Sequence, residues 1–366
     1  MARDGLAEAA PQTLKSARAQ TGYVVLAGCA VLAGIAALLG IVLGPLDIGI
    51  GDTAAVLASK LGLVDASDVS AVKKGVIESI RLPRVTLGLF VGATLGVAGA
   101  AMQGFFRNPL ADPGLIGVST GGALAAVAVI VLGGTALAPV LAMLGSFSLP
   151  IFAFFGSLAA VALIYQVSLV DGRVVVATML LAGVAANALA AAGIGYMTFL
   201  ADDTQLRDLT FWTLGSLGGA VWERVLPAIF LMAVAIAGLV TLARPMNALL
   251  LGEADASTLG VNVEVVKLRA AVLTALGVGA ATAVCGVIGF IGLVVPHLVR
   301  LVTGPDHRYV LPGSALLGAA LILFSDLVAR LAVTPAELPL GVVTAAIGAP
   351  FFFWLLIRDK GKGAYG

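Results

Sequence analysis

The sequence predicts an all-α fold, a polytopic membrane protein with about ten transmembrane helices in one chain. Hydrophobic residues make up 60% of the 366 residues, charged residues only 11%, and the mean hydropathy is +1.09. These values lie well outside the range of a soluble domain. Apolar runs recur that are long enough to cross the roughly 30 Å of hydrocarbon in a bilayer. The 46 glycines, which cluster within such runs, are typical of closely packed membrane helices.

The first 20 residues are polar and are predicted to form a cytoplasmic tail. They lack the short apolar core and the cleavage site of a secretory signal. Tyr23–Leu43 carries no charge and is long enough to be a first span that stays in the protein. The sequence GPLDIGIGD then ends this span, and Asp52–Ile80 is predicted to be an exposed amphipathic stretch.

Further apolar runs predict the other spans. Five of them precede residue 247: Val85–Met102, Leu115–Leu132, Pro150–Val170, Val174–Leu200 and Leu226–Leu242. Leu268–Val302 has 35 residues, too many for one ordinary span, and Gly286 and Gly289 offer a turn that would divide it. Ser314–Val333 and Leu338–Ile357 complete the chain. The count is nine spans if the long run crosses once and ten if it is divided.

The distribution of basic residues favours ten spans with both termini in the cytoplasm. With that topology the inner segments hold 13 of the 21 basic residues, as the positive-inside rule expects. These residues are Arg3, Lys15, Arg18, Arg107, Arg173, Arg244, Lys267, Arg269, Arg300, Arg308, Arg358, Lys360 and Lys362. The predicted organisation is a tail over residues 1–20, a ten-span domain over 21–358 and a cytoplasmic tail over 359–366. The net charge of +1 gives no basic face for binding nucleic acid.

A glycine-rich helix is predicted within the second apolar run. Gly88, Gly92 and Gly96 recur at a spacing of four, and Gly99 follows. This spacing places glycines on one helix face, where two helix backbones can approach closely. Helix packing is the main interpretation, and a smooth wall of a conduit is the alternative.

Asn247–Arg269, NALLLGEADASTLGVNVEVVKLR, is a charged island between two long apolar runs. Pro245 is predicted to end the preceding helix, because the proline ring does not fit within one. A short amphipathic helix should follow, with Leu249–Leu251 on one surface and with Glu253 and Asp255 in water. Gly260 is the expected stop. A solvated loop with no partner is the alternative interpretation.

Three blocks of sequence carry a resemblance to one protein family. They are RLPRVTLGLFVGATLGVAGAAMQGFFRNPLADPGLIGVSTGG at 81–122, LLLGEADASTLGVNV at 249–263, and GVIGFIGLVVPHLVRLVTGPDHRYVLPGSALLGAALILFSDLVARL at 286–331 with ELPLGVVTAAIGAPFFFWLL after it. Together they resemble permeases of binding-protein-dependent ABC importers that take up iron chelates, haem and cobalamin. The resemblance covers most of residues 81–357.

The resemblance implies an assembly in the bacterial cytoplasmic (inner) membrane. Permeases of this family pair as homodimers around a central translocation path. Two separate ATPase subunits bind ATP and Mg, and a periplasmic solute-binding protein delivers the substrate. The expected partners are therefore a second copy of this chain, two ATPase subunits, the binding protein and the lipid bilayer. No cofactor is expected in this chain itself.

The resemblance also assigns roles to particular residues. Contact with the ATPase falls on Leu251, Gly252, Glu253, Ala254, Ala256, Leu259 and Gly260. Docking of the binding protein falls on Arg81, Arg84 and Arg330, since bidentate guanidinium groups suit acidic partners. Snorkelling of these arginines at the membrane interface is the alternative.

The segment RNPLADPG is predicted to be a stiff inner loop. Its two prolines prevent a helix from continuing, and Asn108 and Asp112 favour local turn hydrogen bonds. The resemblance places a cytoplasmic gate at Asn108 and Leu110. A rigid connector without a gating role is the alternative.

Haem is the expected substrate. QLRDLTFWTLGSLGGA, at 205–220, looks most like haem-importing members of the family. Arg207 would attract a haem propionate, and Phe211, Trp212 and Trp222 would present flat apolar surfaces. A belt of aromatic residues at the membrane interface is the alternative for these side chains. Ferric siderophore and cobalamin are the alternative substrates.

Other function classes find little support in the sequence. It contains no Walker motif and no H-E-x-x-H motif, so catalysis by this chain itself is not expected. Cys29 and Cys285 match no metal-ligand spacing and are interpreted as packing residues. An ion-coupled secondary transporter is the alternative from another class, because Asp326 is an ionisable residue within a span. Arg330, at i+4 on the same helix face, would pair with it.

Overall fold

A computed structural model describes residues 4–46, 48–60, 62–65, 67–135, 137–334 and 336–360. Seven helical segments are long and apolar enough to cross a membrane. They contain α1 (Asp4–Val42), α4 (Leu82–Phe106), α7 (Ser148–Val167), α8 (Val176–Leu200), α10 (Trp222–Thr241), α13 (Val263–Cys285) and α15 (His307–Leu331). Three shorter apolar helices accompany them in the described residues: α5 (Val118–Leu132), α14 (Ile291–Thr303) and α16 (Leu340–Lys360). Each apolar run predicted from the sequence therefore forms a helix.

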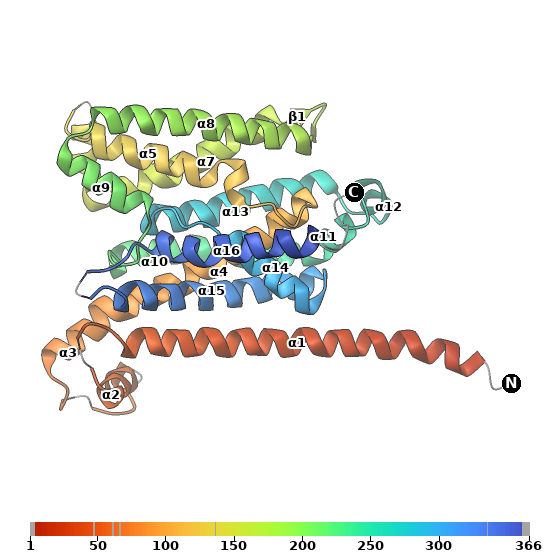
Figure 1. Cartoon of the computed structure of the whole chain (residues 1–366), viewed down its shortest axis with the longest axis horizontal. Helices are drawn as coiled ribbons and strands as arrows, with labels where there is room; N and C mark the ends of the chain where they lie inside the picture. The colour runs from red at the N-terminus through yellow and green to blue at the C-terminus, as the bar shows by residue number, and fades with distance from the viewer. Residues whose placement is uncertain are drawn as a thin grey trace.

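The remaining elements are short and lie mainly at the two ends of the bundle (Figure 1). One end carries α2 (Ile50–Lys60), α3 (Ala71–Val76), the π-helix η1 (Ile77–Arg81) and α9 (Asp203–Thr213). The other carries α11 (Ala243–Leu249) and α12 (Glu253–Thr258), together with both ends of the chain. We call these the α9 end and the α12 end. The other short elements are 3₁₀-helix η2 (Pro113–Ile116), α6 (Ala138–Leu144), 3₁₀-helix η3 (Gly145–Phe147), β1 (Leu169–Val170) and β2 (Arg173–Val174).

Helix α4 is the centre of the bundle. In its most apolar window 78% of the residues are buried, against 17% in α8, so α4 is enclosed by protein while α8 is peripheral. Helices α10, α13, α14 and α15 contact α4 directly. In Figure 1, α5, α7 and α8 lie together on one side of this group and α1 lies on the other.

The glycines of α4 allow these close contacts. A Cβ added to Gly92 would lie 2.3 Å from the carbonyl oxygen of Gly318, and one added to Gly96 would lie 2.0 Å from that of Ser314. A Cβ at Gly99 would lie 1.9 Å from the carbonyl oxygen of Gly292 in α14. Any side chain at these positions would force the helices apart. The predicted packing role of this glycine face is confirmed.

The long apolar run is divided where its glycines predicted a turn. Helix α13 ends at Cys285, and α14 begins at Ile291. Gly286 has φ 74° and Phe290 has φ 68°, so the chain leaves the helical conformation at both limits of the break. The break is hydrogen-bonded rather than open, because the Ser216 N–H donates to the Cys285 carbonyl oxygen at 2.8 Å.

Three features differ from the sequence prediction. Residues 4–20, expected as a tail, continue α1 as regular helix, whereas residues 1–3 and 361–366 of the predicted tails lie outside the described residues. The segment after α8 forms helix α9. The link between α7 and α8 is a β-hairpin, because Asp171 and Gly172 both take positive φ, the two-residue turn that joins antiparallel strands.

Candidate functional site

The charged island Asn247–Arg269, which contains the predicted ATPase contacts, is here called the coupling segment. It includes parts of two short helices, α11 and α12, rather than one. Gly252, with φ 122°, separates α11 from α12, and Gly260, with φ 83°, follows the end of α12 as predicted. The three leucines do not share one surface, because Leu249 is buried whereas Leu250 and Leu251 are exposed. Helix α11 ends at Leu249, so the chain turns before Leu250 and Leu251. From Val263 onward the predicted segment already belongs to α13.

Helix α12 presents apolar side chains to solvent on one side and packs on the other. Leu251 and Leu259, which flank it, are each 64% exposed, and Ala254 is exposed between them. Ala256 is fully buried and holds α12 against the bundle. Glu253 forms an ion pair within the chain, because its Oε2 lies 2.8 Å from Lys267 Nζ. Of the predicted ATPase contacts, the two leucines, Ala254 and Gly260 are thus the exposed ones.

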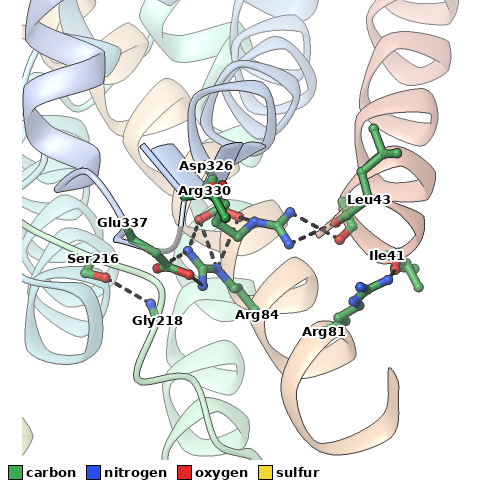
Figure 2. Close-up of polar contacts among 11 residues, drawn as sticks. Ile41, Leu43, Arg81, Arg84, Ser216, Gly218, Asp326, Arg330 and Glu337 are labelled. Atoms are coloured by element: carbon green, nitrogen blue, oxygen red, sulfur yellow. Dashed lines mark hydrogen bonds and ion pairs between the residues drawn. The ribbon is translucent and has the colours of Figure 1, made fainter. Parts of the chain in front are cut away.

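The three arginines predicted to dock a binding protein lie together at the α9 end, but their side chains are buried (Figure 2). Arg81 is 3% exposed, Arg84 7% and Arg330 4%. These three side chains are therefore not exposed at an open face of the structure. The reason is local: each guanidinium group satisfies carboxylates or carbonyl oxygens of neighbouring elements.

Arg84 and Arg330 share one carboxylate. Arg84 Nη2 lies 2.8 Å from Asp326 Oδ1, and Arg330 Nε lies 3.1 Å from Asp326 Oδ2. The other side of the Arg84 guanidinium donates to Glu337, with Nη1 2.9 Å from Oε1. The predicted pairing of Asp326 with Arg330 is confirmed. Asp326 is held between two arginines, so its buried negative charge is compensated without a coupling ion.

Arg81 and Arg330 also bind the end of α1. Arg81 Nη1 donates to the carbonyl oxygens of Ile41 and Val42 at 2.8 and 2.7 Å. Arg330 donates to those of Gly40 and Leu43, both at 3.2 Å. The last carbonyls of a helix have no partner within the helix itself. These two arginines therefore fix the end of α1 to η1 and α15 (Figure 2).

The loop between α4 and α5 has the predicted turn chemistry. Asn108 Oδ1 accepts the Leu110 N–H at 2.9 Å, and Asp112 Oδ1 accepts the Gly114 N–H at 2.8 Å. Burial raises the pKa of Asp112, and the bond from Gly114 opposes this. Asn108 is exposed and Leu110 is half-buried at the α12 end of α4. The predicted gate residues thus sit on a locally braced loop.

Helix α9 carries the predicted substrate residues. Phe211 and Trp212 line a cavity of about 380 Å³ at the α9 end, bounded also by α5, α7 and α13. Arg207 is exposed and does not line this cavity, and the structure gives its side chain no hydrogen bond or ion pair with any described residue. Asp208 and Arg224 are the charged residues that line it. Trp222 lies elsewhere and donates its Nε1–H to the Glu78 carbonyl oxygen at 2.9 Å.

The sequence analysis did not predict the start of α9 or the partners of Glu337 and Lys267. Helix α9 begins with a capping box, in which Asp202 accepts the Gln205 N–H and the Gln205 side chain accepts the Asp202 N–H. The motif Asp-x-x-Gln at 202–205 was the available signal. Glu337 lies 253 positions from Arg84, and Lys267 lies 93 positions from Val174, and no local pattern indicates such partners. Within the described ranges, no three His, Cys, Asp or Glu side chains gather to hold a metal ion.

Comparison with known proteins identifies the family. The model of the FecCD transport family matches residues 30–358. The chain is 50% identical over 283 residues to the hemin transport system permease protein HmuU of Yersinia pestis, covering 77% of this chain and 83% of that protein. It is 42% identical over 316 residues to the cobalamin import system permease protein BtuC of Halobacterium salinarum, covering 86% of this chain and 77% of that protein.

A solved structure agrees with these sequence matches. It is described as an inward-facing conformation of a metal-chelate type ABC transporter, and it superimposes with a TM-score of 0.78 at 29% identity. The alignment covers 91% of this chain and 99% of that one. The fold and the family match agree, and this chain belongs to the FecCD transport family as a multi-pass permease of a type II ABC importer.

Proposed function

We propose that this permease imports haem, which it receives from a periplasmic binding protein. The observation that carries the proposal is the 50% identity to a hemin permease, compared with 42% and 40% for cobalamin permeases of Halobacterium salinarum and Vibrio cholerae. Cobalamin is the second candidate because several permeases of that substrate also match over most of the chain. Ferric siderophore is a further candidate within the same mechanism.

The proposed unit is a homodimer with two ATPase subunits, and each chain crosses the membrane ten times. Adding the three shorter apolar helices to the seven long ones supports this number of spans. Helix α8 supports the pairing, since Leu181, Leu189 and Tyr196 are exposed along it and need lipid or a second copy to cover them. Both ends of the chain lie at the α12 end, which we assign to the cytoplasm (Figure 1).

The ATPase is proposed to dock at the α12 end. Leu251, Ala254 and Leu259 offer an exposed apolar surface there. A contiguous apolar surface at a solvent-facing end is typical of a protein contact. Asn108 and Leu110 lie at the same end, and we assign them to the cytoplasmic gate, which movement of the ATPase subunits would open.

The binding protein is proposed to dock at the α9 end, near Arg81, Arg84 and Arg330. Of the carboxylates around Arg84, Glu337 is the half-exposed one, and Asp326 is buried. An acidic side chain of a binding protein would therefore compete with Glu337 for one edge of the Arg84 guanidinium. Arg81 and Arg330 would stabilise this site indirectly, because they hold the end of α1 in place.

The substrate is proposed to pass along α9. Phe211 and Trp212 give flat apolar surface at the cavity, and Arg207 gives an exposed cation one turn before Phe211 on the same helix. This combination suits an aromatic macrocycle that bears carboxylates. Neither His297 nor His307 lines the cavity at α9, so iron ligands would come from the binding protein.

The test is ATPase stimulation in proteoliposomes that contain the permease, its ATPase and its binding protein. Haem, a ferric siderophore and cobalamin are compared at equal concentration, each with the binding protein present. We expect stimulation and uptake with haem. Stimulation by cobalamin or by the siderophore without stimulation by haem would overturn the proposed substrate and leave the importer mechanism intact.

A further inference from the structure

Lys267 is a buried cation at the α12 end. Its side chain is 2% exposed, although it lies in the second turn of α13, close to solvent. Lys267 Nζ lies 2.8 Å from Glu253 Oε2 in α12 and 3.2 Å from the carbonyl oxygen of Val174 in β2. It also lies 3.7 Å from Glu264 Oε1, one turn earlier in α13. One ammonium group thus joins three separate elements of the chain.

The strand residue that Lys267 binds is held on both of its backbone groups. Lys267 donates to the Val174 carbonyl oxygen, and Glu264 Oε2 accepts the Val174 N–H at 2.9 Å. The β1–β2 hairpin has only two residues in each strand. A hairpin of this size does not hold its position in isolation. The Glu264–Lys267 pair therefore determines where the hairpin sits.

The hairpin is the start of a direct route across the molecule. Helix α8 begins at Val176, two residues after Val174, and runs from the α12 end to the α9 end (Figure 1). Helix α9, with Phe211 and Trp212, follows immediately after α8. A displacement of the hairpin at the α12 end therefore acts on the helix that leads to the cavity at the α9 end.

We propose that Lys267 is a positioning residue that couples movement of α12 to α8 through the Val174 hairpin. The inference rests on the proposed docking of the ATPase at α12. An ion pair is not required for packing, since apolar residues of similar volume commonly replace buried pairs without loss of stability. Hydrogen bonds from Lys267 in α13 to α12 and to β2, in contrast, make the position of each of these three elements depend on the other two. The pair connects the element that contacts the motor with the element that reaches the cavity.

The test compares Lys267→Met with Lys267→Arg in the reconstituted complex of permease, ATPase and binding protein. Lys267→Met keeps the volume and removes the charge, and Lys267→Arg restores the donors. We expect Lys267→Met to raise the ATP hydrolysed per substrate transported by about 2- to 30-fold, the range for residues that couple distant sites. Lys267→Arg should bring the ratio back toward that of the native complex.

A matched control is Arg308→Met. Arg308 is also a basic residue in an ion pair at the α12 end, but its side chain is 59% exposed, and its contacts are Asp306 and the ring of the adjacent Tyr309. Exposed ion pairs contribute little to stability. The ATP hydrolysed per substrate transported by the Arg308→Met complex should therefore equal that of the native complex. The amides of residues 169–175 should exchange hydrogen faster in Lys267→Met than in Arg308→Met, because the hairpin has lost its anchor.

The outcomes separate this proposal from the proposed function. An unchanged ATP-to-substrate ratio in an assembled Lys267→Met complex would overturn the role of Lys267. A native permease that does not co-purify with its ATPase would instead overturn the docking on which the role rests. Where Lys267→Met does not assemble, Glu264→Met releases the Val174 N–H and leaves the contact between Lys267 and Glu253. A raised ratio in that variant supports the proposal, and an unchanged ratio overturns it.

Discussion

Arg84 and Asp326 are 242 positions apart in the sequence, and their side chains form a buried two-point ion pair. Arg84 Nε and Nη2 lie 3.0 and 2.8 Å from Asp326 Oδ1. The pair joins α4 to α15, which form the most extensive helix contact of the bundle, and Arg330 closes the other side of the carboxylate. The side chains of Arg84, Asp326 and Arg330 are therefore part of the interior.

Removing the Arg84 guanidinium should destabilise the permease strongly. Arg84→Met leaves Asp326 with Arg330 alone and Glu337 without its partner, and breaking a buried pair from one side costs roughly 3–5 kcal/mol. Thermal unfolding in detergent measures the effect. Lys73→Met is the control, because its pair with Asp52 is partly exposed and should contribute at most about 1 kcal/mol. Equal losses of stability in the two variants would show that the buried pair stabilises the permease no more than the exposed pair does.

Neutralising Glu337 should strengthen docking of the binding protein. Glu337→Gln removes the half-exposed carboxylate that competes for Arg84 and leaves the buried pair with Asp326 in place. We expect a lower Kd for the substrate-loaded binding protein, measured by surface plasmon resonance at low salt, and a difference that shrinks as salt screens the charges. Asp52→Asn, at another ion pair of the same end, is the control. A higher Kd for Glu337→Gln would contradict docking at Arg84.

A charge at Leu259 should prevent assembly with the ATPase while the permease still folds. Leu259 is exposed at the α12 end, so glutamate there meets water in the free chain but is buried and unpaired in the complex. Such a charge costs several kcal/mol. Co-purification with the ATPase is the measurement. Leu63→Glu, at an exposed leucine of the other end, should assemble normally. Full transport by Leu259→Glu would place the ATPase contact elsewhere.

A methyl group at Gly99 should separate α4 from α14. Its Cβ would lie 1.9 Å from the Gly292 carbonyl oxygen, well inside van der Waals contact, and backbone cannot move aside cheaply. We expect Gly99→Ala to lower the Tm by several degrees, since overpacking costs roughly 1–3 kcal/mol. Gly28→Ala should leave the Tm unchanged or raise it slightly, because no atom lies within 4 Å of that Cβ.

The link between α11 and α15 should weaken in acid. Partial burial alone would raise the pKa of Asp306, but hydrogen bonds from Arg308 and from Asn247 outweigh it and lower the pKa to about 2. A lowered pKa means that the carboxylate stabilises the fold above its unfolded pKa of about 3.8 and loses this effect as pH falls toward 2. The Tm difference between the native chain and Asp306→Ala should be largest at neutral pH and should shrink below about pH 4. A difference that is constant with pH would refute this.

The sequence predicted the helices well because their signals are local. Apolar runs located the long helices of the described chain, Gly286 marked the division of the long run, and the glycines of α4 marked its packed face. Asn108 and Asp112 make the turns that their side chains favour. Each of these features depends on residues within a few positions of one another, which is the information that a single sequence contains.

The candidate sites were predicted less well because they depend on distant partners. Nothing near Arg84 indicates that Asp326 and Glu337 will cover it, so its burial could not be foreseen. Lys267 was interpreted as one more inner basic residue, although it binds Glu253 and Val174. The cavity at α9 contains Arg224 rather than Arg207 for the same reason. Which charge faces a cavity is settled by the packing of helices that are far apart in the chain.

The binding of α1 by Arg81 and Arg330 has a consequence for biosynthesis. Helix α1 leaves the ribosome before the residues that bind its end, where four carbonyl oxygens, from Gly40 to Leu43, accept hydrogen bonds from these two arginines. Arg81 is made 40 positions after Ile41, but Arg330 is made 290 positions after Gly40. Until then the end of α1 lacks part of its native partners. This helix is therefore completed only after the helices from α4 to α14 have been synthesised.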